Sequence, residues 1–260
     1  MTQSTKIPKV IHYCWFGGNP LPDKAKKCIE SWRKYLPGYE IKEWNESNFD
    51  VHCCPFVHEA YMLKKWAFVS DYARFWIMYH HGGLYFDTDV ELLRDFEPIV
   101  SAGPFMGCEP EWDVLGLRIA AGLGLGAYPK MKVYYDFLNI YEQMHLIQPS
   151  GTLKLPTVVD IVTEYFLKKG ARQSSEVIRC EEILVYPPEY FCPMNYGSRQ
   201  VNITSNTYSI HLYEGSWLKR HWLETFEEPF WKLFHHVNHQ VLWRLRNMLY
   251  RWSFHLYKTL

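Results

Sequence analysis

Residues 81–91 read His-Gly-Gly-Leu-Tyr-Phe-Asp-Thr-Asp-Val-Glu, and the fold prediction rests on this stretch. The glycine pair ends the preceding helix, because glycine readily adopts the left-handed conformation that closes helices. From residue 84 onward, apolar and polar side chains alternate, as they do on the two faces of a β-strand. One face is mostly apolar and is expected to enter a core. The other face carries Tyr85, Asp87, Asp89 and Glu91.

Three carboxylates on one face of a strand repel one another unless water or a cation compensates their charge. Hard divalent cations prefer oxygen ligands, and Mg²⁺ or Mn²⁺ usually shares such carboxylates with substrate phosphates. The pattern therefore predicts a metal–diphosphate site at Asp87 and Asp89. A solvated edge strand, whose charges guard against aggregation, is the alternative explanation.

The composition favours a globular protein with a substantial core. The chain has 260 residues, of which 48% are hydrophobic and 17% aromatic. Lys and Arg number 28 and so do Asp and Glu, so a basic surface for nucleic acid is not expected. Residues 1–9 are polar and no apolar run reaches the length of a membrane span, which predicts a cytoplasmic protein.

The seven cysteines are scattered, and reduced thiols are the simplest interpretation. His52, Cys53, Cys54 and His58 form a cluster that suggests zinc. Their spacing fits no common zinc site, so zinc is a minor alternative.

The residues before the acidic stretch predict alternating strands and helices. A strand at 10–13 leads into a glycine-containing loop at 14–20, which is typical of nucleotide-binding α/β folds. A helix after Pro22 and a strand near 39–44 follow. The loop has neither the lysine of a P-loop nor the glycine spacing of a dinucleotide fingerprint. The segment 67–81 is a strong helix with an apolar stripe.

Three further features depend on what lies near the acidic stretch. Asp71 and Arg74 share a helix face, either as a surface ion pair or as part of the same cleft. Trp15 and Phe16 are suited either to stacking on a base or to burial. The small residues of 120–127 indicate close backbone packing or the close approach of a ligand.

Several of these stretches together resemble a known family. Residues 7–17, 68–74 and 82–89, followed by His211 and the pair at 216–217, occur in the order found in the Asp-x-Asp sugar transferases. This family includes bacterial capsular-polysaccharide glycosyltransferases (glycosyltransferase family 32). The chain also resembles, more distantly, fungal mannosyltransferases and the catalytic domains of glucosylating toxins. The combination is specific, although each motif alone is weak.

The resemblance implies an α/β fold, a nucleotide-sugar-binding α/β/α sandwich of the GT-A type with a mixed, mainly parallel sheet. Residues 1–225 would form the catalytic domain and 226–260 a helical extension. It implies a hexosyltransferase that needs Mn²⁺ or Mg²⁺ and usually retains anomeric configuration. The donor would be a nucleotide sugar, with UDP favoured over GDP. The acceptor would be a saccharide or a lipid-linked saccharide in the synthesis of capsular or other surface polysaccharide.

Roles are carried over residue by residue from this resemblance. Asp89 and His211 would bind the metal, and the catalytic group would be Asp71, Arg74 and Asp87. The nucleotide sugar would contact Trp15, Phe16, Ser70, Asp71, Arg74, Tyr85, Asp87, Ser216 and Trp217.

Two other function classes share part of this pattern. Phosphatases that form an aspartyl-phosphate also place Asp-x-Asp after an apolar strand. They need a later acidic pair, but the aspartates after Asp95 are isolated, at Asp113, Asp136 and Asp160. A non-catalytic carbohydrate-binding protein is compatible with the aromatic content of 17%.

The tail at 229–260 contains no Asp or Glu and has five Lys or Arg residues. Its Trp, Phe and Leu residues follow an approximately helical spacing. A basic helix of this kind can lie in a membrane interface, which would place the protein peripherally on the inner face of the membrane. Packing of the same helix on the catalytic domain or on a second subunit is the alternative.

Overall fold

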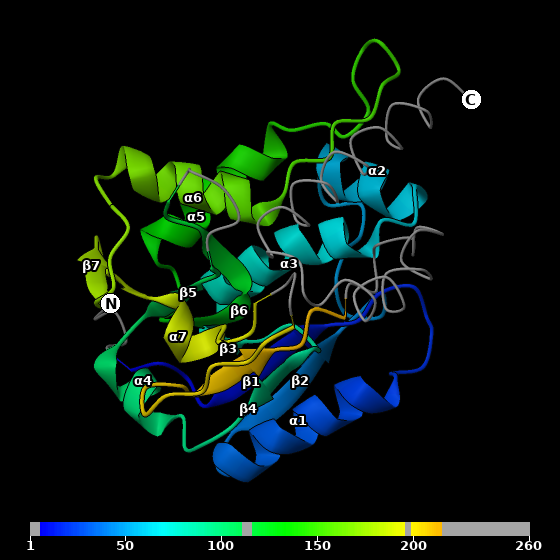
Figure 1. Ribbon diagram of the computed structural model, residues 1–260. Helices are drawn as coiled ribbons and strands as arrows, with labels where there is room; N and C mark the ends of the chain where they lie inside the picture. The colour runs from blue at the N-terminus through cyan, green and yellow to red at the C-terminus, as the bar shows by residue number, and fades with distance from the viewer. Residues whose placement is uncertain (1–5, 111–115, 196–198, 215–260) are drawn as a thin grey trace, which may run out of the picture. The chain divides into compact units, whose positions relative to one another are not determined.

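The computed structural model describes residues 6–110, 116–195 and 199–214 (Figure 1). Chain contacts separate residues 1–214 from residues 215–260. The predicted domain boundary at 225 and the predicted helical tail therefore lie outside the described residues and stay predictions.

A seven-stranded sheet has the strand order β2-β1-β3-β6-β5-β8-β7. Its strands are β1 (Val10–Cys14), β2 (Glu40–Trp44), β3 (Gly83–Tyr85), β5 (Phe105–Cys108), β6 (Ile119–Ala127), β7 (Ile178–Cys180) and β8 (Ile183–Tyr186). The β1–β2, β1–β3 and β5–β8 pairs are parallel. The β3–β6, β5–β6 and β7–β8 pairs are antiparallel. The α/β class and the mixed, mainly parallel sheet are confirmed, because β1, β2, β3, β5 and β8 run in one direction and β6 and β7 run in the other.

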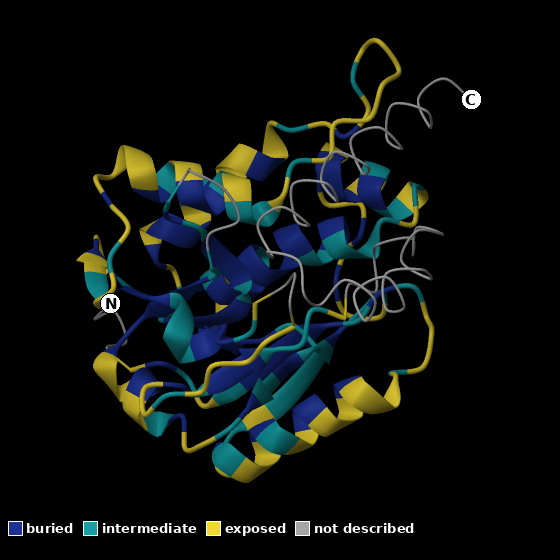
Figure 2. Cartoon of the chain, viewed as in Figure 1, coloured by how far each residue is buried: buried dark blue, intermediate teal, exposed yellow. Residues whose placement is uncertain are grey.

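Helices cover both faces of this sheet (Figure 1). They are α1 (Asp23–Tyr35), α2 (Pro55–Met62), α3 (Trp66–His81), α4 (Glu97–Ala102), α5 (Lys132–Glu142), α6 (Val158–Lys168) and α7 (Pro188–Phe191). One buried apolar cluster lies under α2, α3, α5 and α6, and the other under α1, α4 and α7. Figure 2 shows the buried residues concentrated along the sheet between these layers. None of the described helices is long and apolar enough to span a membrane.

The acidic stretch is not one continuous strand, which corrects the prediction. β3 ends at Tyr85, and β4 (Val90–Leu92) pairs instead with β9 (Ser209–His211) in a separate two-stranded sheet. A turn joins the two strands, and in it the Val90 amide donates to the Asp87 carbonyl oxygen at 3.0 Å. The expected apolar positions Leu84, Phe86 and Val90 are all buried. The two aspartates are therefore brought together by a turn and not by strand alternation.

Candidate functional site

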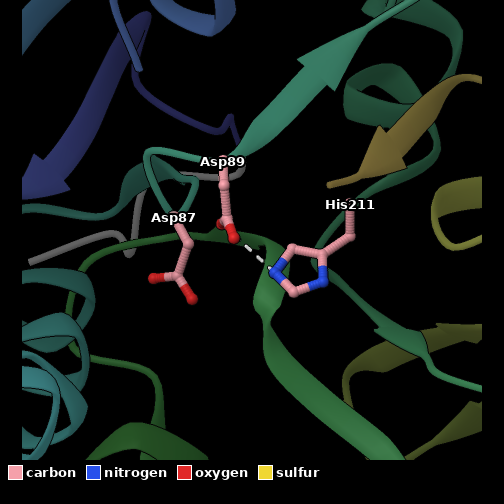
Figure 3. A group of neighbouring side chains, drawn as sticks. All are labelled: Asp87, Asp89 and His211. Carbon is pink, nitrogen blue, oxygen red and sulfur yellow. Dashed lines mark ion pairs between the residues drawn. The ribbon is translucent and has the colours of Figure 1, made fainter. Parts of the chain in front are cut away.

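Asp87, Asp89 and His211 converge just beyond the end of β3 (Figure 3). One potential ligand atom from each lies within 4.8 Å of the other two, and this is the one such group of three found in the described residues. His211 Nε2 is 3.2 Å from Asp89 Oδ1. Glu91, the third carboxylate of the predicted strand face, does not join the group, because it lies in β4 opposite Ile210.

Backbone pairing fixes His211 relative to Asp89. In the antiparallel β4–β9 sheet, His211 lies opposite Val90, the residue after Asp89. The Leu212 amide donates to the Asp89 carbonyl oxygen at 2.9 Å, and the Glu214 amide donates to Asp89 Oδ2 at 3.0 Å. The segment after β9 therefore holds both the backbone and the carboxylate of Asp89, a role for Glu214 that the sequence did not indicate.

Helix α1 holds the other edge of this small sheet. The Trp32 indole Nε1 donates to the Val90 carbonyl oxygen at 2.8 Å, and Ser31 Oγ accepts from the Leu92 amide at 2.9 Å. Trp32 lies in the helix predicted after Pro22, and nothing local in the sequence distinguishes it from an ordinary core residue.

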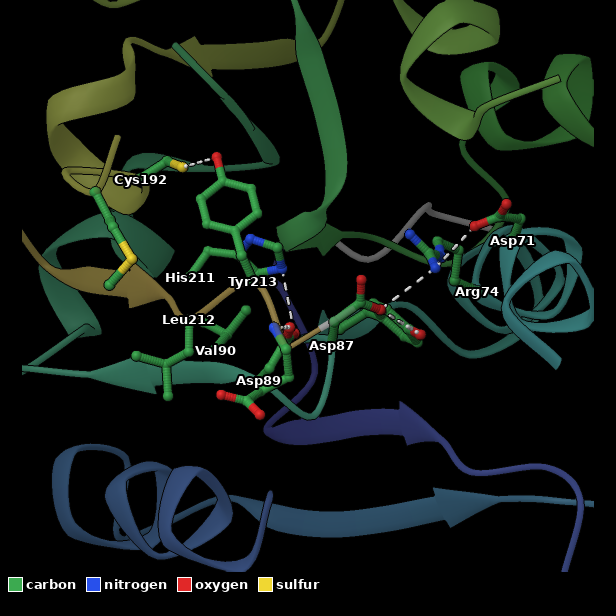
Figure 4. A network of polar contacts seen from close by, with 12 residues as sticks. Asp71, Arg74, Asp87, Asp89, Val90, Cys192, His211, Leu212 and Tyr213 are labelled. Atoms are coloured by element: carbon green, nitrogen blue, oxygen red, sulfur yellow. Dashed lines mark hydrogen bonds and ion pairs between the residues drawn. The ribbon is translucent and has the colours of Figure 1, made fainter. Parts of the chain in front are cut away.

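Arg74 joins Asp71 to Asp87 (Figure 4). Its Nη2 atom lies 2.9 Å from Asp71 Oδ1 and 3.3 Å from Asp87 Oδ1. The Tyr85 hydroxyl donates to Asp87 Oδ1 at 3.0 Å, and the guanidinium lies over the Tyr85 ring. The Arg74 side chain is only 4% exposed and that of Asp71 10%. The surface ion pair considered above is therefore excluded, and both residues extend from α3 to the Asp-x-Asp turn.

Gly122 approaches the same carboxylate from β6. A Cβ atom added there would lie 2.0 Å from Asp87 Oδ2, closer than any real contact. The Gly122 carbonyl oxygen also accepts from the Asp87 amide at 3.1 Å. Of the two interpretations of the small residues at 120–127, close packing is therefore correct at Gly122. Its missing side chain leaves room for the carboxylate of Asp87.

The charges of the site influence one another strongly. Burial raises the pKa of Asp87, and the charge of Arg74 opposes this while that of Asp89 adds to it. Burial also acts to raise the pKa of Asp89, but the charge of His211 and several hydrogen bonds bring it below its usual value. Burial raises the pKa of Asp71 despite the adjacent Arg74. Asp71 and Asp87 thus share one guanidinium while Asp89 pairs with His211, and a further cation would stabilise these three carboxyl groups.

The donor atoms fit a divalent cation. Two carboxylates and one imidazole nitrogen lie within reach of a single ion, and each residue is partly buried. Mn²⁺ accepts such a mixed oxygen and nitrogen set, whereas Mg²⁺ prefers oxygen ligands and water. A metal site at Asp89 and His211 therefore agrees with the chemistry of the residues present.

The two aromatic residues of the first loop occupy different environments. Trp15 is partly exposed, and its indole Nε1 donates to the Asn19 carbonyl oxygen at 2.6 Å. Phe16 is 4% exposed and packs edge-to-face on Phe49, with ring centroids 5.9 Å apart. For Phe16, burial is the alternative that the structure shows, whereas base stacking by Trp15 stays a prediction.

The remaining predicted residues contribute less to the described site. Ser70 precedes Asp71 on α3, and its hydroxyl donates to the Trp66 carbonyl oxygen at 3.1 Å. Ser216 and Trp217 lie outside the described residues. His52 and His58 approach each other, with Nδ1 atoms 2.7 Å apart, but no third metal-binding residue joins them in the described parts of the chain.

Comparisons with known proteins show which families this chain resembles. Residues 22–106 match the family described as "Glycosyltransferase sugar-binding region containing DXD motif", which confirms the predicted resemblance to the Asp-x-Asp sugar transferases. Inositol phosphoceramide mannosyltransferase 1 of Schizosaccharomyces pombe is 29% identical over 112 residues, which are 39% of this chain and 34% of that protein. The chain thus spans about a third of the length of this curated relative.

Two further matches extend over most of the chain. An uncharacterized glycosyltransferase of Acanthamoeba polyphaga mimivirus is 28% identical over 81% of this chain and 84% of its own length. A solved glycosyltransferase involved in glycosylation of the major capsid of PBCV-1 covers 81% of this chain and 95% of its own, with 14% identity and a TM-score of 0.46. The two sequence relatives are thus named as sugar transferases.

Proposed function

We propose that this protein is a metal-dependent glycosyltransferase that moves a hexose from a nucleotide sugar to a saccharide acceptor. The observation that carries the proposal is the convergence of Asp87, Asp89 and His211 beside the buried Asp71–Arg74 pair. Carboxylates and an imidazole at this spacing suit a cation that binds a diphosphate, and the adjoining polar pair suits a sugar. The names of the relatives support the same class of reaction.

Asp89 and His211 would hold the cation, with Mn²⁺ favoured over Mg²⁺ by the imidazole. When bound, the cation would stabilise the negative charge that develops on the leaving diphosphate. The hydrogen bonds from the amides of Leu212 and Glu214 to Asp89 keep that ligand in place. Asp87, held by Tyr85 and Arg74, would face the ribose or the sugar.

Arg74 is the candidate donor to the transferred sugar. Its Nη1 atom is buried and has no hydrogen-bond partner in the described residues. An unsatisfied buried N–H group costs free energy, which a sugar hydroxyl or a phosphate oxygen would recover on binding. Asp71 would orient hydroxyls and stabilise positive charge on the ring in the transition state, as carboxylates do in glycoside hydrolysis.

The same contacts bear on the stereochemistry of transfer. Asp71 and Asp87 are both paired with Arg74, so neither is a free carboxylate nucleophile. A retaining reaction would then proceed by attack of the acceptor on the face from which the diphosphate departs. UDP as the nucleotide and a lipid-linked saccharide of a surface polysaccharide as the acceptor complete the proposal. The tail at 226–260 would hold the enzyme peripherally at the cytoplasmic face of the membrane.

One experiment tests the activity and identifies the donor. Melting temperature is measured with UDP-, GDP- and dTDP-sugars, each with and without Mn²⁺, because ligands that bind the native state raise it. Donors that stabilise the protein are then assayed for metal-dependent hydrolysis without acceptor. We expect a UDP-sugar to stabilise only with the metal and to be hydrolysed slowly. Binding without hydrolysis would indicate a carbohydrate-binding protein, and phosphate release from simple monoesters would indicate a phosphatase.

A further inference from the structure

The segment between α5 and α6 folds into a hairpin with an unusual surface. Ile147 and Leu153 form an antiparallel bridge, and the Lys154 amide donates to the Leu146 carbonyl oxygen at 2.9 Å. Figures 1 and 2 show this segment extending past α2 and α6, with most of its length exposed. Its backbone is partly hydrogen-bonded internally, so the hairpin can enter a less polar environment at reduced cost.

Large aliphatic side chains lie open on this hairpin. Ile147 is 44% exposed, Leu153 49% and Leu155 41%. Ile147 and Leu153 are opposite each other, so their side chains share one side of the hairpin, and Leu155 follows two residues later. Met62, at the end of α2, is 65% exposed. We call these four residues the aliphatic surface.

Glu59 joins α2 to the hairpin. Its Oε2 atom accepts from the amides of Leu146 and Ile147 at 2.7 and 3.0 Å, and its Oε1 atom lies 2.7 Å from His145 Nδ1. Met62 follows Glu59 by three residues on the same helix and therefore faces the same side. This contact gives Met62 and Ile147 a fixed relationship, so the aliphatic surface is built from two separate elements of the fold.

Positive charge accompanies these apolar residues. Lys64 and Lys154 are exposed, Lys65 is half-buried, and none of the three pairs with a carboxylate in the described residues. Residues 143–157 contain no Asp or Glu, and the carboxylate of Glu59 is already occupied. Apolar side chains flanked by lysines match the boundary between the acyl chains and the headgroups of an anionic bilayer.

We propose that the aliphatic surface is an interfacial binding site for an anionic lipid bilayer. Met62, Ile147, Leu153 and Leu155 would enter the boundary between headgroups and acyl chains, with Lys64 and Lys154 at the level of the lipid phosphates. Helix α3 begins four residues after Met62 and carries Asp71 about 8 Å further along its axis. The bilayer would thus lie at the same end of α3 as Asp71. This inference is separate from the proposed activity, because vesicle binding needs no nucleotide sugar.

Partition of the full chain into vesicles tests the proposal. Binding is measured with vesicles of phosphatidylcholine alone and of phosphatidylcholine with phosphatidylserine. The variant Ile147→Ser/Leu153→Ser/Leu155→Ser should lower the partition coefficient on anionic vesicles by about tenfold or more. Ile203→Ser is the control, because Ile203 is 60% exposed but lies outside this surface. All four positions are exposed, so the fold should be retained, and melting temperature verifies this.

Charge reversal provides an independent variant. Lys64→Glu/Lys154→Glu should weaken binding to anionic vesicles, whereas Lys27→Glu/Arg179→Glu, with the same change in net charge at other exposed positions, should have little effect. Hydrogen exchange of the full chain should show protection of the amides of 146–154 when vesicles are added. This readout separates the hairpin from any contact of the tail. Absence of binding to anionic vesicles would overturn the proposal. So would binding in which the amides of 146–154 are not protected and the triple serine variant binds as well as wild type.

Discussion

Gly122 faces Asp87 so closely that a Cβ atom there would lie 2.0 Å from Asp87 Oδ2. The atom in the way is a carboxylate held by Tyr85 and Arg74, and not the end of a flexible side chain. Any side chain at position 122 must therefore displace Asp87 or move β6.

Gly122→Ala is accordingly expected to lower sugar transfer by about a hundredfold, since small displacements of positioned groups have effects of this size. The measurement is kcat/KM for the donor identified above, together with the melting temperature. Gly38→Ala is the matched control, because a Cβ there meets nothing within 4 Å. Full activity of Gly122→Ala would show that Asp87 need not hold its position.

Asp89→Ala should abolish metal-dependent nucleotide binding and transfer while the protein stays folded. Asp89 is one of three converging ligand groups and also accepts from the Glu214 amide, so its loss removes a ligand and loosens the segment after β9. The stabilisation of melting temperature by Mn²⁺ with the donor reports this directly. Glu91→Ala, two residues away but outside the cluster, should retain the stabilisation. Turnover at the wild-type rate with ordinary Mn²⁺ would remove Asp89 from the metal site.

His211→Ala should raise the Mn²⁺ concentration needed for half-maximal activity more than it changes stability. The imidazole Nε2 lies 3.2 Å from Asp89 Oδ1, so it can share an ion with that carboxylate. Replacing it removes one of the two proposed metal ligands and leaves Asp89 to bind the metal more weakly. The titration is done on the full chain at constant donor concentration. If the two titration curves coincide, His211 has a structural role only.

Arg74→Ala should lower the free energy of unfolding by about 3–5 kcal/mol, the usual cost of leaving a buried charge without its partner. Arg74 and Asp71 are 4% and 10% exposed, and Arg74 also pairs with Asp87. Urea denaturation gives the difference. Lys132→Ala, which breaks an ion pair whose lysine is 76% exposed, should cost less than about 1 kcal/mol. Equal effects of the two variants would contradict the importance of burial here.

Stability should decrease in acid because of His12. Burial, reinforced by the nearby charge of His81, lowers the pKa of His12 to about 3. The ring accepts from Trp44 Nε1 at 3.0 Å and donates from its own Nε2 to the Gly82 carbonyl oxygen at 3.1 Å, so the neutral form is satisfied.

The unfolded chain takes up this proton near the reference pKa of about 6.5, before the native state does. The contribution of His12 to the free energy of unfolding is therefore constant above about pH 6.5. Below it, this contribution falls by about 1.4 kcal/mol per pH unit as the pH decreases toward 3. Urea denaturation at pH 7 and pH 5 should show a decrease about 2 kcal/mol larger for wild type than for His12→Gln. Parallel decreases would mean that His12 is protonated in the native state.

Several features followed from the sequence alone because they depend on local backbone geometry. Apolar periodicity placed α3 and its end at the glycine pair, and it identified Leu84, Phe86 and Val90 as buried. It assigned Tyr85 to the polar face, but the structure buries this residue as well. The concentration of carboxylates at Asp87 and Asp89 indicated a cation site without knowledge of the fold. Family resemblance added His211, which no local pattern singled out.

Tertiary structure alone decided how these residues meet. The strand predicted over 84–91 breaks after Tyr85, because β4 pairs with β9 and not with the main sheet. That pairing places His211 beside Asp89, and α1 holds it through Trp32. Side-chain alternation reports which face of a strand is apolar, but it carries no information about the distant strand that will supply the hydrogen bonds. Register between remote segments is set when the whole chain packs, and the geometry of this site depends on that register.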